Sequence, residues 1–270
     1  MLEVQRISKT FFPGTPNVVQ ALRKVSLTIE PGSFVCVIGS NGSGKSTLLN
    51  AVAGTIALDE GRIQLDGRDV TKWPEHRRAR MIGRVFQDPF RGTAPSMTIA
   101  ENLAIAAKRG KQRGLAWALG TLSRRKLRDR VAAMGLGLED RLDNPIGTLS
   151  GGQRQSLTLL MAGMLNPSLL LLDEHTAALD PKSADQVIQL TQDFVGRARL
   201  TTLMVTHSMD QAAYLGDRVI MMDRGQVVYD ITGADKRRLT RDELLQRFED
   251  IRRIHQLDES AAGMLRRQYV

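Results

Sequence analysis

The chain has 270 residues and carries 38 basic against 29 acidic side chains, a formal net charge of +9 at pH 7. Apolar residues make up 42% and charged residues 25% of it, ordinary values for a globular protein, so the composition excludes a disordered or fibrous chain. No apolar run reaches the roughly 18 residues of a membrane-spanning helix, and the first residues contain no apolar signal core, so we expect neither an integral nor a secreted protein.

The positive charge favours polyanionic partners, namely nucleic acid, anionic lipid or nucleotide, although a solvated surface explains it equally well. Aromatic residues make up only 4% of the chain, which leaves few side chains to stack on bases and disfavours nucleic acid. The single cysteine, Cys36, can form no internal disulfide and fits a reducing compartment.

The first third of the chain is predicted to form strands. Val25–Ile29 alternates apolar and polar side chains, the pattern of a half-buried strand, and Gly61–Gly67 repeats it. Phe34–Ile38 is a continuous apolar run, as a buried parallel strand requires, and Cys36 lies inside it as a core residue.

This buried strand is followed by a motif that fits the phosphate-binding pattern G-x-x-x-x-G-K-[ST]. Its residues are Gly39, Ser40, Asn41, Gly42, Ser43, Gly44, Lys45, Ser46 and Thr47. Glycines let backbone N–H groups converge on a polyphosphate, and the N-terminus of the following helix favours negative charge. We expect Lys45 to reach the β- and γ-phosphates of ATP and the Ser46 hydroxyl to bind Mg²⁺.

Residues from about 90 to 150 differ in character and predict an inserted helical subdomain. Thr98 and Glu101 form a capping box at the start of an Ala- and Leu-rich helix. Basic clusters follow, which we interpret as solvated helix faces, with an acidic or membrane-proximal partner as the alternative. These basic residues are Lys108, Arg109, Lys111, Arg113, Arg124, Arg125, Lys126, Arg128 and Arg130.

From Ser150 the alternation of strands and helices returns. Leu169–Leu172 is a buried strand that ends in two carboxylates, Asp173 and Glu174, and burying carboxylates is costly unless they meet a cation. We expect Asp173 to hold the Mg²⁺ shell and Glu174 to orient and polarise an attacking water.

The last third contains further helix starts and strands. Asp180 followed by Pro181 predicts the beginning of a helix, and Ser208 with Gln211 predicts a capping box of another. Thr240 and Glu243 are predicted to cap a last helix. The strands expected here are Leu203–Thr206, which ends at His207, and the hairpin of Val219–Met222 and Val227–Tyr229.

A third motif, Leu149-Ser150-Gly151-Gly152-Gln153, precedes a helical run, Arg154–Leu165. With the phosphate loop before it and the Asp-Glu strand after it, the chain resembles the ATP-binding cassette (ABC) ATPases over about residues 1–235. The resemblance implies an α/β fold, a P-loop NTPase (RecA-like) core with an antiparallel β subdomain and the helical subdomain. Residues 236–270 would then form a short C-terminal helical extension.

The resemblance also implies roles for individual residues. Gln87 matches the glutamine that contacts Mg²⁺ and water, and His207 matches the histidine that contacts the γ-phosphate. Ala178–Asp180 matches the loop that crosses a dimer interface, with Asp180 at its end. Phe11 matches the aromatic residue that stacks on adenine, although the neighbouring Phe12 is an alternative.

The signature residues Ser150, Gly151, Gly152 and Gln153 are expected to act across a subunit boundary. Two glycines at a helix N-terminus make a second anion site. In the family, each ATP lies between the phosphate loop of one subunit and the signature of the other, so the resemblance implies a head-to-tail homodimer.

The resemblance implies a transporter subunit at the cytoplasmic face of the membrane. Two permease subunits and an extracytoplasmic substrate-binding protein would complete it, with a permease segment received near Gln87–Gly92, and no nucleic acid is expected. The alternative is a soluble ABC ATPase that acts on nucleic acid, ribosomes or protein assembly, which Arg252, Arg253, Arg266 and Arg267 keep open.

The segment Glu174–Pro181 resembles the ATPases of tryptophan/tyrosine-type importers, which implies an amino-acid-like solute. His175 departs from the common pattern, in which proline follows the glutamate. It is either a surface variant or a group that tunes the neighbouring Glu174.

Overall fold

The computed structural model describes residues 1–110, 121–251 and 253. Its centre is a six-stranded sheet in the order β10-β9-β3-β8-β7-β6, in which only the edge strand β10 runs antiparallel to its neighbour. The strands are β3 (Phe34–Gly39), β6 (Ile82–Val85), β7 (Leu169–Asp173), β8 (Thr202–Val205), β9 (Arg218–Asp223) and β10 (Gln226–Thr232).

A second sheet of four strands, in the order β2-β1-β4-β5, is antiparallel throughout. Its strands are β1 (Leu2–Phe11), β2 (Val19–Ile29), β4 (Glu60–Leu65) and β5 (Arg68–Asp69). The predicted strand at Val25–Ile29 is thus the end of a longer one. β1 was not predicted, because polar residues interrupt its alternation of buried and exposed side chains.

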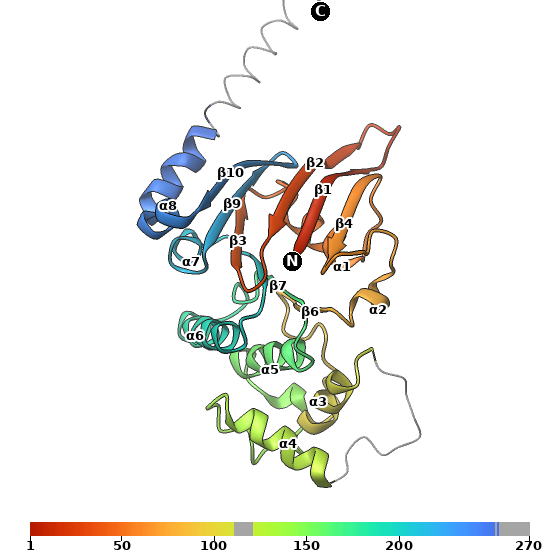
Figure 1. The fold of residues 1–270 in the computed structure, drawn as a ribbon. Coiled ribbons are helices and arrows are strands. Elements are labelled where there is room, and N and C mark those ends of the chain that lie inside the picture. The colour runs from red at the N-terminus through yellow and green to blue at the C-terminus, as the bar shows by residue number, and fades with distance from the viewer. Residues whose placement is uncertain (111–120, 252, 254–270) are drawn as a thin grey trace, which may run out of the picture.

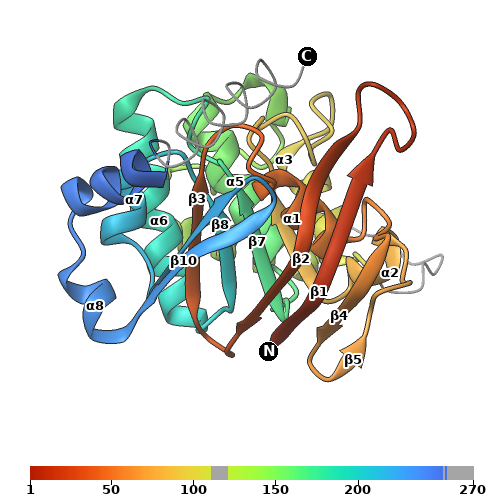
Figure 2. The same cartoon turned by 90° about the horizontal axis from the view of Figure 1, so that it is seen from above.

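The two faces of the central sheet pack against different elements. Val35 and Val37 of β3 face a core shared with the antiparallel sheet and with α1 (Lys45–Ala53). Cys36 and Ile38 face the opposite core, with α6 (Pro181–Ala198) and α7 (Met209–Tyr214). Figure 2 shows α6 and α7 on one side of β3 and the strands β1, β2 and β4 on the other. A continuous apolar strand is therefore needed here, as the sequence indicated.

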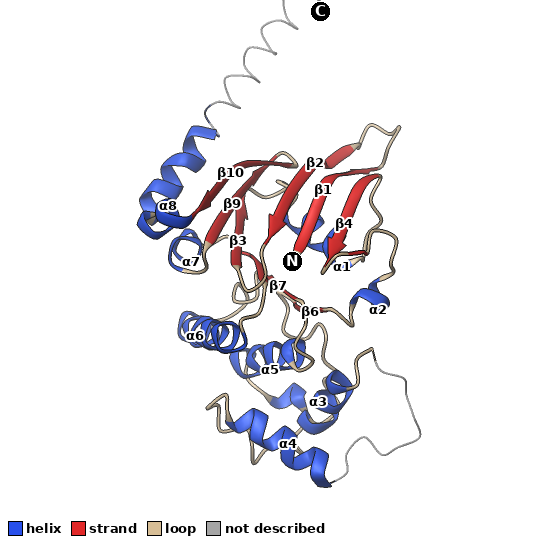
Figure 3. Ribbon diagram, in the orientation of Figure 1, coloured by secondary structure: helices blue, strands red, loops and turns tan. Residues whose placement is uncertain are grey.

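The helical subdomain has a hydrophobic cluster of its own. It contains α3 (Ile99–Ala107), α4 (Thr121–Ala132) and the 3₁₀ turn η1 (Ile146–Thr148). α5 (Gly151–Gly163) belongs to two cores, because Leu157 and Leu160 join this cluster while Leu159 packs under the central sheet. Figures 1 and 3 show these helices at the opposite end of the molecule from the antiparallel strands.

Two short helices, α2 (Glu75–Arg78) and α8 (Gly233–Arg238), complete the labelled elements. Residues 241–251 form a further helix, begun by the predicted capping box of Thr240 and Glu243. Its Leu244 and Ile251 are buried in the same core as β3. No described helix is long and apolar enough to span a bilayer. Five basic residues noted in the sequence lie outside the described residues, namely Lys111, Arg113, Arg252, Arg266 and Arg267.

One predicted cap is wrong in part. The Ser208 hydroxyl accepts a hydrogen bond from the Gln211 N–H at 3.2 Å, as expected. The Gln211 side chain, however, bonds to the hydroxyls of Thr206 and Thr176 instead of closing the box. This amide both donates and accepts, and it joins α7 to the loops after β7 and β8.

Candidate nucleotide-binding site

The predicted functional residues follow the carboxyl ends of four adjacent strands. In the parallel register Val37 pairs with Val205, Val205 with Asp173, and Leu172 with Val85. The loops after these strands therefore meet at one edge of the sheet, the usual place for ligands in such folds. They carry the phosphate loop after β3, Gln87 after β6, Asp173 and Glu174 at the end of β7, and His207 after β8.

The phosphate loop leaves the N-terminus of α1 open. Gly44 is its N-cap and has no side chain to cap it, and among the described residues no side chain bonds to the first N–H groups of the helix. Gly44 has a φ of 102°, and a Cβ there would lie 2.4 Å from the Ala21 carbonyl oxygen, so no other residue fits without a shift. A helix end with unpaired donors is an anion site.

Lys45 lies folded into this loop. Its Nζ donates to the carbonyl oxygens of Gly39 and Ser40, each at 2.9 Å, and the residue is only 5% exposed. Burial lowers the pKa of Lys45, while the charges of Glu174 and Asp173 oppose that shift. The buried Ser43 hydroxyl has no hydrogen-bond partner among the described residues. A cation, an unpaired hydroxyl and free N–H groups together match a phosphate chain.

Glu174 and His207 are in contact. The Nε2 atom of His207 lies 2.6 Å from Oε1 of Glu174. Glu174 has a φ of 45° and its N–H donates to the Val205 carbonyl at 2.9 Å, so β8 holds the strained residue in place. The structure thus brings together two residues that are 33 positions apart in the sequence.

The end of α5 that carries the signature is capped by its own residues. The Gln153 N–H donates to the Ser150 hydroxyl at 3.3 Å, and the Ser150 N–H donates to the Gln153 side chain at 3.2 Å. Ser150 and Gly151 are exposed. A Cβ on Gly152 would lie 2.9 Å from Cβ of Ser183, so α6 approaches too closely for a larger residue.

Three further predicted residues lie on the surrounding elements. Gln87 is exposed beyond β6. Asp180 is the N-cap of α6, where its carboxylate accepts from the Ser183 N–H at 3.0 Å. Phe11 ends β1, and the adjacent Phe12 is 65% exposed. Their roles in binding ATP stay predictions.

The interpretation of His175 as a surface variant is wrong. The residue is 1% exposed, and its Nε2 lies 3.1 Å from the Thr191 hydroxyl in α6. Since that hydroxyl donates to the Val187 carbonyl, we assign the proton to Nε2 of His175. Burial lowers the pKa of His175 to about 4, so a neutral ring ties the loop after Glu174 to α6.

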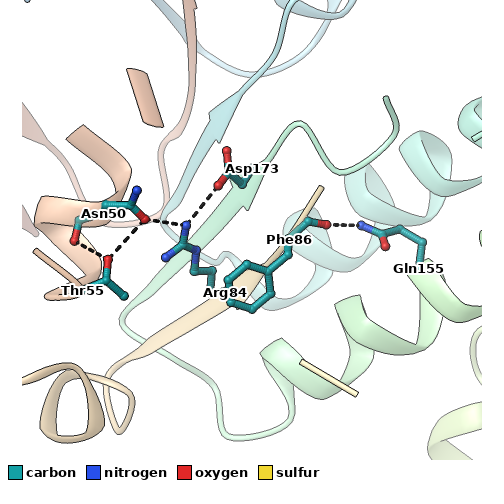
Figure 4. A network of polar contacts seen from close by, with 6 residues as sticks. All are labelled: Asn50, Thr55, Arg84, Phe86, Gln155 and Asp173. Carbon is teal, nitrogen blue, oxygen red and sulfur yellow. Dashed lines mark hydrogen bonds and ion pairs between the residues drawn. The ribbon is translucent and has the colours of Figure 1, made fainter. Parts of the chain in front are cut away.

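Sequence reasoning missed Arg84, which contacts Asp173. Its Nη2 lies 3.0 Å from Oδ2 of Asp173 and 2.8 Å from Oδ1 of Asn50 (Figure 4). The available signal was the lone charge of Arg84 within the apolar run Met81–Phe86, which contains β6.

The sequence profile described as ABC transporter matches residues 22–177. The chain belongs to the ABC transporter family. It is accordingly an ATP-binding, ATP-hydrolysing subunit that powers transport, and the alternative of a soluble ABC ATPase outside transport is set aside.

Curated relatives of this ABC ATPase are transporter subunits. It is 45% identical over 251 residues to a tyrosine transport ATP-binding protein of Clostridioides difficile, covering 92% of this chain and 99% of the relative. It is 36% identical to a methionine import ATP-binding protein of Pseudomonas entomophila, over 84% of this chain and 66% of that protein.

Solved ABC cassettes have the same fold. A dimeric cassette in a post-hydrolysis state, bound to ADP and Pi, superposes with a TM-score of 0.73 at 29% identity, over 86% of this chain and 98% of that one. The ADP conformation of another cassette gives a TM-score of 0.75 at 26% identity, over 92% and 98%. The predicted P-loop NTPase architecture is confirmed.

Proposed function

We propose that this ABC ATPase binds MgATP at the open end of α1, closes as a head-to-tail homodimer, and drives import of an amino-acid-like solute through separate permease subunits. The observation that carries the proposal is the uncapped N-terminus of α1 beside the buried Lys45 and the unpaired Ser43 hydroxyl. Such an end is stabilised by a bound polyphosphate.

The residues at the strand ends fit a Mg²⁺ ion. Mg²⁺ usually takes one or two protein oxygens and completes its shell with phosphates and water. Ser46 is an exposed residue, and Asp173 lies near enough to act on the charge of Lys45. Ser46 and Asp173 would hold the ion, with Gln87 as a third ligand. When bound, it neutralises charge on the β- and γ-phosphates.

The chain's own residues then supply the remaining steps. Glu174 accepts a hydrogen bond from the attacking water and draws its proton away. His207, now 2.6 Å from Glu174, donates to the γ-phosphate once ATP is present. Ser150 and Gly151 of the second subunit meet the same phosphate from the opposite side.

Replacing Glu174 by Gln tests this arrangement. The amide keeps the size of the side chain but is no general base, whose loss typically costs on the order of 10²–10⁴ in rate. MgATP should still bind, and the closed dimer should accumulate. Size-exclusion chromatography with ATP and with ADP measures this, and a shift to dimer with ATP alone is expected. Wild-type turnover by the variant in the assembled transporter would remove Glu174 from the catalytic role.

A groove between the core and the helical subdomain fits the permease. It encloses about 850 Å³ and is lined by Phe86, Arg91 and Gly92, close to the predicted Gln87–Gly92. Six of its lining residues are basic or His and only Glu75 is acidic, so we propose a permease segment with acidic residues. Charge reversal at Arg91 should release the permease during co-purification. If the wild-type subunit still retains the permease at high salt, this docking mode is contradicted.

The solute is proposed from the relatives. One relative is a tyrosine transport protein and another a methionine import protein. We propose an aromatic amino acid, delivered by an extracytoplasmic binding protein to a permease on whose cytoplasmic face this subunit sits. Purified transporter in vesicles should show ATP hydrolysis stimulated by binding protein with tyrosine or tryptophan. If only an unrelated solute stimulates hydrolysis, the proposed solute is wrong, while the proposed ATPase activity still holds.

A further inference from the structure

Arg84 is a charged residue placed inside a sheet. It is the third residue of β6, between the buried Gly83 and Val85, and its side chain is only 12% exposed. Removing a guanidinium from water is costly unless other groups compensate its charge and donors. The contacts of the Arg84 guanidinium therefore indicate its role.

The contacts of Arg84 join two parts of the nucleotide site. Nη2 is shared between Oδ2 of Asp173, at 3.0 Å at the end of β7, and Oδ1 of Asn50, at 2.8 Å in α1. Asn50 stands on the helix whose N-terminus is the phosphate loop, and Asp173 is the proposed Mg²⁺ ligand. One side chain thus links α1 to the carboxylate at the end of β7.

One further contact holds the guanidinium, which lies over the Phe86 ring, while its Nε–H has no hydrogen-bond partner among the described residues. Its central carbon lies 4.6 Å from the centre of the Phe86 ring, and the Phe86 carbonyl accepts from Nε2 of Gln155 at 2.9 Å. Figure 4 shows the guanidinium edge on Asp173, with the second carboxylate oxygen of Asp173 directed away from Arg84. A guanidinium held in this way has little freedom to rotate towards another partner.

We propose that Arg84 is a positioning residue for the divalent cation. By binding Oδ2, it fixes the rotation of the Asp173 carboxylate and keeps Oδ1 available to the metal shell. Partners that hydrogen-bond a ligating carboxylate typically contribute 10–100-fold to metal affinity. The proposal rests on the proposed function, in which Asp173 holds Mg²⁺.

Arg84 could also weaken metal binding by repulsion, and the direction of the change in metal affinity separates this effect from orientation. A cation beside the carboxylate also repels a second cation, and if Arg84 acted only as a competitor its removal would tighten metal binding. Orientation predicts the reverse. Asn50 and the Phe86 ring also hold the guanidinium, which keeps it away from Oδ1 of Asp173. We therefore expect orientation of the carboxylate to outweigh repulsion of the metal ion.

Mn²⁺ binding to the full chain tests the proposal. Mn²⁺ replaces Mg²⁺ as a paramagnetic probe, with a non-hydrolysable ATP analogue at saturation, and free Mn²⁺ is read by electron paramagnetic resonance. Arg84→Met should weaken Mn²⁺ binding about tenfold. Affinity for the analogue in EDTA should change less than about twofold, a separation that mere loss of packing would not produce. Unchanged or tighter Mn²⁺ binding would overturn the proposal.

Arg109→Met is the matched control. Arg109 lines the same groove, but its guanidinium donates to the Ala162 carbonyl, at 3.0 Å. Its loss should leave Mn²⁺ binding unchanged. Should Arg84→Met not fold, Arg84→Gln is measured in the same way with the same expectation. Asp173→Asn separates the two proposals: if it weakens Mn²⁺ binding and the Arg84 variants do not, Arg84 is refuted alone; if it has no effect, the Mg²⁺ site itself is refuted.

Discussion

Two helix N-termini in this molecule carry glycine-rich motifs, and they differ in what satisfies them. α1 begins at Gly44 without any side-chain cap, next to a buried lysine. α5 begins at Ser150 with a complete capping box, in which Gln153 returns the hydrogen bond. Among the described residues no side chain caps the first end, whereas the second end is capped by its own residues.

The difference suggests an order of events. The end of α1 gains from a phosphate at once, so a single subunit should bind ATP. The end of α5 gains little until a phosphate with several charges is brought against its exposed Ser150 and Gly151, which requires a second subunit. In the proposed dimer, ATP would then shift the population towards the closed state because it fits that state better.

Lys45→Ala breaks the first region and should have the largest effect. The variant loses the only cation of the loop, and affinity for MgATP should fall at least about 100-fold, roughly 2.7 kcal/mol. Turnover should be lost with it. Equilibrium titration with a fluorescent ATP analogue measures the affinity. Binding and turnover equal to those of the wild type would refute the phosphate-loop assignment.

Ser150→Arg breaks the second region and leaves the first intact. Affinity of the isolated subunit for ATP should stay within about twofold of wild type, because α1 is unchanged. The arginine would occupy the space of the partner's phosphates, so ATP-driven dimerisation and turnover should be lost, by about 100-fold in rate. A variant that hydrolyses ATP at the wild-type rate would show that the signature does not act across the interface.

Acidification should destabilise the loop after β7, which His175 ties to α6. His175 is neutral when folded, with a pKa of about 4 against an ordinary 6.5, so the unfolded chain binds more protons below pH 6.5. Stability is therefore complete above pH 6.5 and falls as the pH drops towards 4, by about 2 kcal/mol at pH 5. Urea unfolding of the wild type and His175→Gln at pH 7 and pH 5 measures it. Equal losses in both proteins would contradict the assignment.

Ser150→Ala sharpens the comparison with the smallest effect. It removes the cap without adding bulk, at a cost of about 1 kcal/mol in stability. No equivalent substitution exists at α1, because its N-cap, Gly44, has no side chain to remove. Thermal unfolding with and without ATP measures it, and a cost above about 3 kcal/mol would indicate that Ser150 supports more than its own helix.

Local patterns in the sequence predicted the buried strands β3, β7 and β8 with the loops at their ends, but not β1 or β6. Continuous apolar runs predicted β3 and β7, and the residues that follow them do meet at one edge of the sheet. The contacts of Arg84 were out of reach, because its partners Asn50 and Asp173 lie 34 and 89 residues away. His175 was misread for the same reason, since its partner is in α6. Pairing across the fold leaves no trace in local periodicity.

The shared position of α5 also has a consequence for unfolding. The helical subdomain is an insertion in sequence, yet α5 contributes Leu157 and Leu160 to its cluster and Leu159 to the core under the central sheet. Neither cluster can lose α5 without exposing the apolar face of the other. The two bodies should therefore melt together in one cooperative transition, and the amides of α5 should be among the slowest in the chain to exchange with solvent.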